Sequence, residues 1–121
     1  MNYEFKIIAF TDDAQFSISL ARECNKYGFL LSFIDQKCEI KDELADDIIS
    51  IVLLDLNNFI ENPFNHCRDI KINYGIPVFG VLNQFSKKVQ VKAKEVGFDL
   101  IFTKKMLIRS IREVVIHVSK E

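Results

Sequence analysis

The sequence lacks the features that would assign it to a membrane, secreted or metal-rich class of protein. No apolar run among its 121 residues approaches the length of a membrane span, and the N-terminal "MNYEFK" does not have the architecture of a signal peptide. The cysteines Cys24, Cys38 and Cys67 are odd in number and widely spaced, which matches neither a metal site nor a disulfide framework. We therefore expect a cytoplasmic protein with reduced thiols.

Low-complexity tracts, internal repeats and a large net charge are also absent. The net charge is −1, with 49% hydrophobic and 27% charged residues, as in an ordinary globular domain, and the length predicts a single domain over 1–121. The charge is uneven: residues 1–61 hold 12 acids and 5 bases, whereas residues 62–121 hold 5 acids and 11 bases. No recognition motif accompanies the basic half, so we expect neither a nucleic-acid partner nor a membrane partner.

What the chain does contain is a regular alternation of short apolar runs and helical patterns. The runs predict strands over 5–10, 29–34, 50–55, 75–83 and 98–103, and the periodicity predicts helices up to Tyr27, over 41–49, 64–73 and 86–97, and from Met106 onward. Nearly all-apolar strands are typical of a parallel sheet with helices on both faces. The sequence therefore predicts an α/β, flavodoxin-like doubly wound sandwich with strand order 2-1-3-4-5.

Charged residues follow the strands that meet at the carboxyl edge of such a sheet. Asp12 follows the first strand, Asp55 ends the third and Lys104 follows the fifth. Two carboxylates suit a hard divalent cation, a carboxylate can accept a phosphoryl group, and a lysine can contact a phosphoryl oxygen. Asp12 has a second, compatible interpretation as a helix cap, and Asp13 is interpreted as an acid of the first helical turn.

The stretches "KIIAFTDDAQ", "IVLLDLNN", "GIPVFGVLNQ" and "AKEVGFDLIFTKK" resemble the CheY-like response-regulator receiver domains in their order and spacing. The resemblance covers nearly the whole chain. It implies two-component signal transduction or a phosphorelay, with Asp55 as the phosphoacceptor for a histidine kinase and Lys104 as a phosphoryl contact. It also implies Mg²⁺ held by Asp12, Asp55 and the backbone carbonyl of Asn57.

Several positions depart from the pattern of that family, including the loop after the third strand, where the usual proline and glycine are missing. Thr11 replaces the first acid of the pair, which weakens the magnesium site, and Leu82 replaces the hydroxyl residue that receives a phosphoryl oxygen. Asn83 stands where a small residue is usual, so that its amide either obstructs Asp55 or hydrogen-bonds it. Ile101 replaces the switch aromatic, and Lys105 replaces a proline. These changes predict an atypical receiver whose phosphorylation switch is damaged.

Two apolar residues fall off the apolar stripes of the last two predicted helices. Val91 lies off the stripe of the helix over 86–97, and Ile116 lies opposite the stripe of the final helix, which also carries Arg109 and Arg112. Because these helices should be neighbours, the four residues predict a surface for a protein partner or a homodimer, formed by both helices and the strand over 98–103.

Three functional hypotheses remain open on the sequence alone. The first is a non-enzymatic, atypical receiver domain that signals by protein–protein contact, independently of phosphorylation. The second is a conventional receiver phosphorylated on Asp55 by a histidine kinase. The third, a flavodoxin-like enzyme or small-molecule carrier, is disfavoured because the loops after the first and third strands lack a Gly-, Ser- or Thr-rich phosphate cradle.

Overall fold

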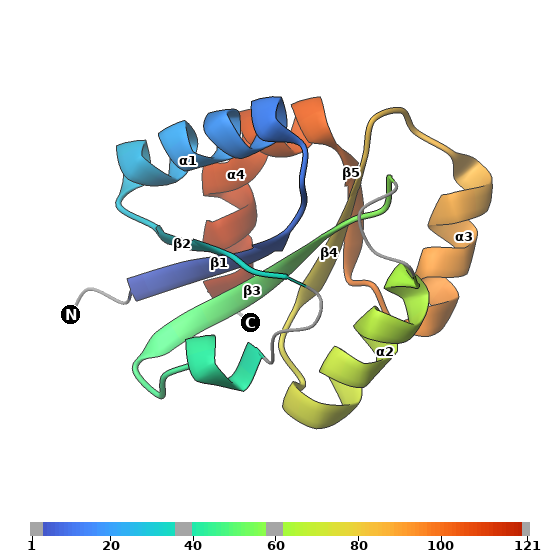
Figure 1. Ribbon diagram of the computed structural model, residues 1–121, viewed down its shortest axis with the longest axis horizontal. Coiled ribbons are helices and arrows are strands. Elements are labelled where there is room, and N and C mark those ends of the chain that lie inside the picture. The colour runs from blue at the N-terminus through green and yellow to red at the C-terminus, as the bar shows by residue number, and fades with distance from the viewer. Residues whose placement is uncertain (1–3, 36–39, 58–61, 120–121) are drawn as a thin grey trace.

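In the part of the chain that the structure describes, five parallel strands form a sheet (Figure 1). The structure, a computed structural model, describes residues 4–35, 40–57 and 62–119. The strands are β1 (Glu4–Phe10), β2 (Leu30–Phe33), β3 (Ile48–Asp55), β4 (Val78–Leu82) and β5 (Leu100–Thr103). Their order is β2-β1-β3-β4-β5 and every neighbouring pair is parallel, so the predicted doubly wound sheet is confirmed.

Four α-helices cover the two faces of the sheet. They are α1 (Ala14–Tyr27), α2 (Pro63–Tyr74), α3 (Lys87–Val96) and α4 (Lys104–Ser119). Helices α1 and α4 contact each other on one face, and α2 and α3 contact each other on the opposite face (Figure 1). No helix in the described part of the chain is long and apolar enough to cross a membrane.

Local sequence signals explain where these helices begin and end. Asp13 accepts a hydrogen bond from the N–H of Phe16 and so caps α1, which ends at Gly28 in a left-handed conformation with φ 75°. The final helix begins at Lys104, two residues earlier than predicted. The hydroxyl of Thr103 accepts the N–H of Met106 and thereby satisfies one of the first free donors of α4.

The helix predicted over 41–49 is wrong. Only a short 3₁₀ helix, η1 (Ile40–Glu43), forms there, and β3 already begins at Ile48. The β-branched residues Ile48 and Ile49 pair with β1 instead of completing a helix. The side chain of Lys6 fixes η1 to the sheet, because its ammonium donates to the carbonyl oxygen of Glu43 at 3.0 Å and pairs with the Glu43 carboxylate at 3.1 Å.

Buried apolar side chains form one cluster on each face of the sheet, and alternate residues of β1 and β3 point into different clusters. Ile7 and Leu53 pack under α1 and α4, whereas Ile8 and Leu54 pack against α2 and η1 residues. Because both faces are buried, the strands hold their register firmly and their carboxyl ends meet at one edge. This edge carries the candidate site.

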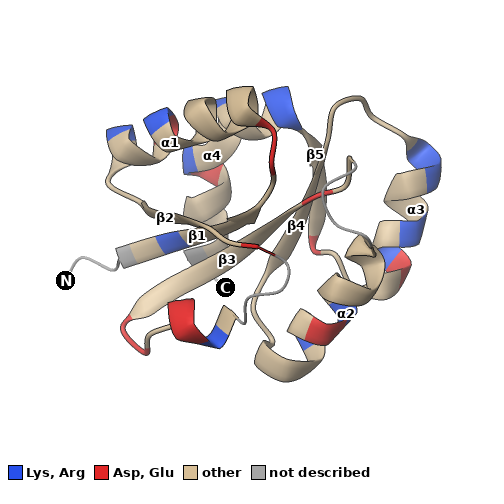
Figure 2. Cartoon of the chain, in the orientation of Figure 1, with Lys and Arg blue, Asp and Glu red and all other residues tan. Residues whose placement is uncertain are grey.

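Charged residues are distributed unevenly over this framework (Figure 2). Acidic residues gather at η1 and the turn before β3, and basic residues follow α3, where all four lysines are exposed. The members are Asp42, Glu43, Asp46 and Asp47 in the first group, and Lys87, Lys88, Lys92 and Lys94 in the second. These two groups, one from each half of the sequence, therefore lie in separate regions of the surface.

Candidate functional site

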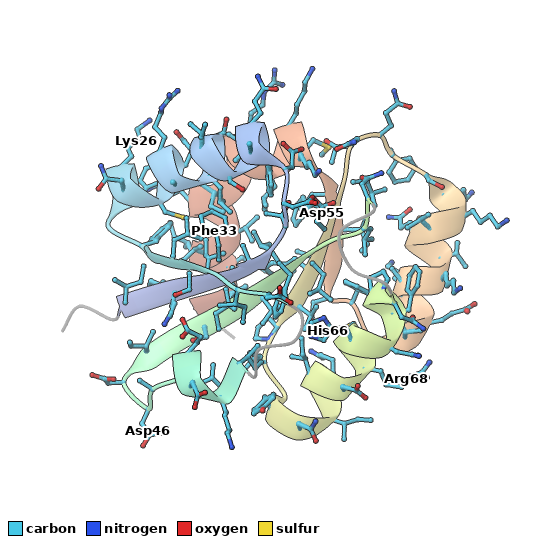
Figure 3. All side chains as sticks on the ribbon, in the orientation of Figure 1. Lys26, Phe33, Asp46, Asp55, His66 and Arg68 are labelled. Carbon is cyan, nitrogen blue, oxygen red and sulfur yellow. The ribbon has the colours of Figure 1, made fainter. Side chains whose placement is uncertain are left out.

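Asp55 ends β3 at the carboxyl edge of the sheet and is labelled in Figure 3. Its side chain is only 1% exposed. A buried carboxylate requires hydrogen-bond donors or a cation, because burial removes its hydration. Two neighbouring loops and the start of α4 supply three such groups.

Lys104, the first residue of α4, supplies the cation. Its ammonium nitrogen lies 2.9 Å from Oδ2 of Asp55 and 2.9 Å from Oδ2 of Asp13. The Lys104 side chain is 11% exposed, and its ammonium lies 5.6 Å from the ring centre of Phe16. Lys104 therefore joins the end of β3, the start of α1 and the start of α4.

Thr11 and Asn57 complete the surroundings of Asp55. The Thr11 hydroxyl donates to Oδ2 of Asp55 at 2.5 Å, and the backbone N–H of Asn57 donates to Oδ1 at 2.9 Å. The side-chain oxygen of Asn57 in turn accepts the backbone N–H of Asn83 at 2.6 Å. Asn57 thus connects Asp55 to the loop after β4. We refer to Thr11, Asp13, Asp55, Asn57 and Lys104 as the Asp55 network.

The structure corrects the roles predicted for the two acids after β1. Asp13, not Asp12, caps α1 and pairs with Lys104, whereas Asp12 is exposed and takes no part in the contacts of Asp55. The physical reason is the start of α1 at Ala14. The preceding residue is the cap, and once Oδ1 of Asp13 accepts the Phe16 N–H, Oδ2 is directed at Lys104.

The ion pairs shift the pKa of two groups in the network. Burial lowers the pKa of Lys104, but the hydrogen bonds with Asp55 and Asp13 outweigh burial, so the pKa of this ammonium is raised above its ordinary value. The N–H of Phe16 and then Lys104 lower the pKa of Asp13. Both shifts favour the charged forms, so the network holds a protonated lysine beside ionised Asp13.

Leu82 and Ile101, the apolar replacements named above, are both packed. Leu82 ends β4 and is buried. Ile101 packs so closely over Gly80 that a Cβ at residue 80 would lie 2.7 Å from its Cδ1 atom. Neither side chain offers a polar atom to a ligand at the sheet edge. Asn83 is exposed and binds Asn57 through its backbone N–H, which is neither of the contacts with Asp55 that the sequence suggested.

The predicted partner surface is only partly as expected. Val91 is 50% exposed on α3, and Arg109 and Arg112 are exposed on α4, but Ile116 is half-buried. The two helices cover opposite faces of the sheet and flank the edge strand β5, so they are not packed side by side (Figure 1). Any docking surface there must include the exposed edge of β5, where Leu100 is exposed.

The carboxylates of Asp55 and Asp13 are already engaged within the chain. Both oxygens of Asp55 already accept hydrogen bonds, and Oδ2 of Asp13 is paired with Lys104. Within the described ranges, no group of three or more His, Cys, Asp or Glu residues is placed to hold a metal. A pocket of about 530 Å³ opens beside the network, with Asp13, Lys104 and Arg109 in its lining, whereas Asp55 lies behind these side chains.

The cysteines and histidines lie outside the network. Cys24 and Cys67 are free and buried, and burial raises the pKa of each thiol to about 11, which makes both inert. Cys38 lies outside the described residues. His66 is half-buried on α2, and His117 is exposed on α4.

Comparison of the sequence with protein-family models finds no match. A relative from Bacillus subtilis (strain 168), the uncharacterized transcriptional regulatory protein YvcP, is 30% identical over 100 residues, which are 83% of this chain. The chain spans only 42% of the length of that relative.

Solved structures provide the comparison of folds. A two-component response regulator from Clostridium difficile matches with a TM-score of 0.79 at 12% identity, covering 98% of each chain. The Mn²⁺-bound form of response regulator Rcp1 matches with a TM-score of 0.68 at 16% identity, covering 90% of each chain. The chain therefore has the fold of the response-regulator receiver domains, as its sequence predicted.

Proposed function

We propose that this chain is an atypical receiver-fold signalling domain that acts through protein–protein contact and does not require phosphorylation of Asp55. The observation that carries the proposal is the closed surroundings of Asp55. Its carboxylate is 1% exposed, and both oxygens are engaged by Lys104, Thr11 and Asn57. A nucleophile must expose an oxygen to its substrate, and here the pocket is lined by Asp13 and Lys104 instead.

The route from the site to the surface also favours this proposal. A ligand shifts a conformational equilibrium only by contacts that differ between the two states. Leu82 has no polar atom to contact a phosphoryl oxygen, and Ile101 is held against Gly80. A phosphoryl group on Asp55 would therefore make few contacts that could change the conformation of β4 and β5.

In this proposal, the surface that binds the protein partner is formed by α3, the edge of β5 and α4. Val91 and Leu100 supply exposed apolar area, and Arg109 and Arg112 supply positive charge, together with the lysines of α3. A protein partner with apolar and acidic side chains fits this chemistry. YvcP is described as a transcriptional regulatory protein, which supports a downstream partner that controls transcription.

Amide NMR spectra with Mg²⁺ and beryllofluoride, a phosphoryl mimic, test the independence from phosphorylation. We expect no shifts, or shifts restricted to residues next to Asp55. Shifts that spread from Asp55 to α3 and β5 would contradict the proposal and support a conventional phosphoacceptor. That second candidate is favoured by one observation, the 2.9 Å contact between Lys104 and Asp55, since the same ammonium can neutralise a phosphoryl oxygen.

A matched pair of surface variants tests the docking surface. Val91→Asp places a charge in the proposed interface, whereas Ile72→Asp places one on α2, where Ile72 is 74% exposed. Both variants should fold with stabilities within about 0.5 kcal/mol of wild type. We expect Val91→Asp alone to abolish binding to the partner or self-association, measured by pull-down and by size-exclusion chromatography. Equal behaviour of the two variants would remove α3 from the interface.

A further inference from the structure

The ammonium of Lys104 occupies a position that a bound cation would otherwise have to fill. It lies 2.9 Å from one oxygen of Asp13 and 2.9 Å from one oxygen of Asp55, on side chains 32% and 1% exposed. Two carboxylates this close to one another repel unless a positive charge stands between them. Lys104 provides that charge within the chain.

We propose that Lys104 is the permanent counter-cation of this site and excludes divalent cations from it. This inference concerns the cation that the site holds, so its test does not depend on which protein partner binds the domain. It also explains the threonine at position 11. A hydroxyl donates a hydrogen bond to Asp55, whereas a third carboxylate there would add negative charge to a site that already holds two carboxylates and one ammonium.

Competition between the two kinds of cation follows from their geometry. Mg²⁺ and Mn²⁺ need several oxygen atoms in close, near-octahedral contact. Oδ2 of Asp55 already accepts hydrogen bonds from Thr11 and Lys104, which leaves Oδ1 of Asp55 for a metal unless those bonds break, and Asp13 would have to release Lys104. Asp12 is exposed and free of these contacts, but one carboxylate alone does not make a site.

Mn²⁺ is the probe, since its unpaired electrons broaden the amide resonances of residues near a bound ion. For the wild-type protein we expect no selective broadening around Asp12, Asp13 and Asp55, and no gain in melting temperature with Mg²⁺ beyond that with NaCl of equal ionic strength. For Lys104→Met we expect selective, saturable broadening there and a saturable gain in melting temperature. The apparent Mn²⁺ affinity should rise roughly tenfold or more.

Two further variants make the test specific. Lys71→Met breaks another lysine–aspartate pair, Lys71–Asp99, also 2.9 Å long, and should gain no response to Mn²⁺ because a single carboxylate remains. Thr11→Ala frees one position on Asp55 but keeps Lys104, so it should stay unresponsive to Mn²⁺.

The proposal is overturned by selective Mn²⁺ broadening around Asp55 in the wild type or in Thr11→Ala. It is equally overturned if folded Lys104→Met shows no such broadening. If Lys104→Met is unfolded without added ions, folding induced by Mn²⁺ supports the proposal. If that variant stays unfolded in Mn²⁺, the wild type and Thr11→Ala decide the outcome.

Discussion

Two lysine–aspartate pairs in this protein have the same length but opposite surroundings. Lys104–Asp55 and Lys71–Asp99 both have nitrogen–oxygen distances of 2.9 Å. The side chains of the first pair are 11% and 1% exposed, whereas those of the second are 29% and 40% exposed. Exposed pairs are screened by water and contribute little, but a buried charge that loses its partner is strongly destabilising. Burial, not distance, therefore distinguishes the two pairs.

The additional contacts of the two pairs also differ. Asp55 also accepts hydrogen bonds from Thr11 and Asn57, and Lys104 also binds Asp13, so the loops after β1 and β3 and the start of α4 depend on one pair. Asp99 also accepts the backbone N–H of Val78 at 2.8 Å and so ties the start of β5 to that of β4, and Lys71 also donates to the carbonyl oxygen of Ile76. The first pair thus connects the carboxyl edge of the sheet as a unit, and the second fastens one local corner.

Removing each lysine in turn gives the largest expected difference. Lys104→Met leaves Asp55 buried with no cation, and we expect the free energy of unfolding to fall by about 3–5 kcal/mol. Lys71→Met should cost about 1 kcal/mol or less, because Asp99 remains hydrated. Urea denaturation at pH 7 and fixed ionic strength measures both. Equal losses for the two variants would show that burial does not set the strength of the pairs.

The hydroxyl of Thr11 gives the next largest effect and shows how far the buried pair depends on its neighbours. Thr11→Val keeps the shape of the side chain but removes the donor to Asp55, so we expect a loss of about 1.5–3 kcal/mol in the free energy of unfolding.

A second threonine serves as the control for that measurement. Thr103→Val removes a hydroxyl that caps α4 instead of binding a charge, and should cost about 1 kcal/mol. Both losses come from the same urea titrations. A smaller loss for Thr11→Val than for Thr103→Val would mean that Lys104 alone compensates Asp55.

The sequence predicted the fold well because its signals are local and agree with one another. The strands are short apolar runs, and the helix predicted over 86–97 forms as α3, with Ser86 as its N-terminal cap and Gly97 after its last residue. The expected helix over 41–49 failed because the choice between helix and strand at Ile48 and Ile49 was made by pairing with β1, which is non-local. Periodicity within the segment could not reveal that pairing.

The sequence predicted where the candidate site lies, but only some of the contacts between its residues. Strand ends indicated correctly that Asp55 and Lys104 meet, because the order of a parallel sheet brings its carboxyl ends together. Whether Asp12 or Asp13 contacts Lys104 depends on the residue at which α1 begins. If the helix began one residue earlier, the two side chains would point in different directions. The capping role of Asp13 was the available signal, since the cap is held next to the first turn. The hydrogen bond from Asn83 to Asn57 had no signal in the sequence, because backbone donors of loops carry no residue preference.

His66, a half-buried histidine on α2, extends the comparison and gives the smallest effect. Its ring lies 4.6 Å from that of Phe10, and its Nδ1 atom is buried with no hydrogen-bond partner in the described structure. Burial lowers the pKa of His66, with Asp69 acting in the opposite direction. A folded-state pKa below the unfolded value means that unfolding takes up a proton, so stability is present above about pH 6.5 and is lost as the pH falls through the folded pKa.

We expect the wild-type protein to lose at most about 1 kcal/mol in the free energy of unfolding between pH 7 and pH 5 through this histidine. His66→Phe keeps an aromatic ring against Phe10 and removes the titrating group, so its stability should depend less on pH. His117→Phe, the same substitution at an exposed position on α4, is the matched control. Urea midpoints across this range decide the matter. If the urea midpoints of His66→Phe and the wild type change equally with pH, protonation of His66 does not contribute to the pH dependence. The half-buried ring would then accommodate a positive charge, whereas we expect that Asp55 without Lys104 cannot accommodate its negative charge.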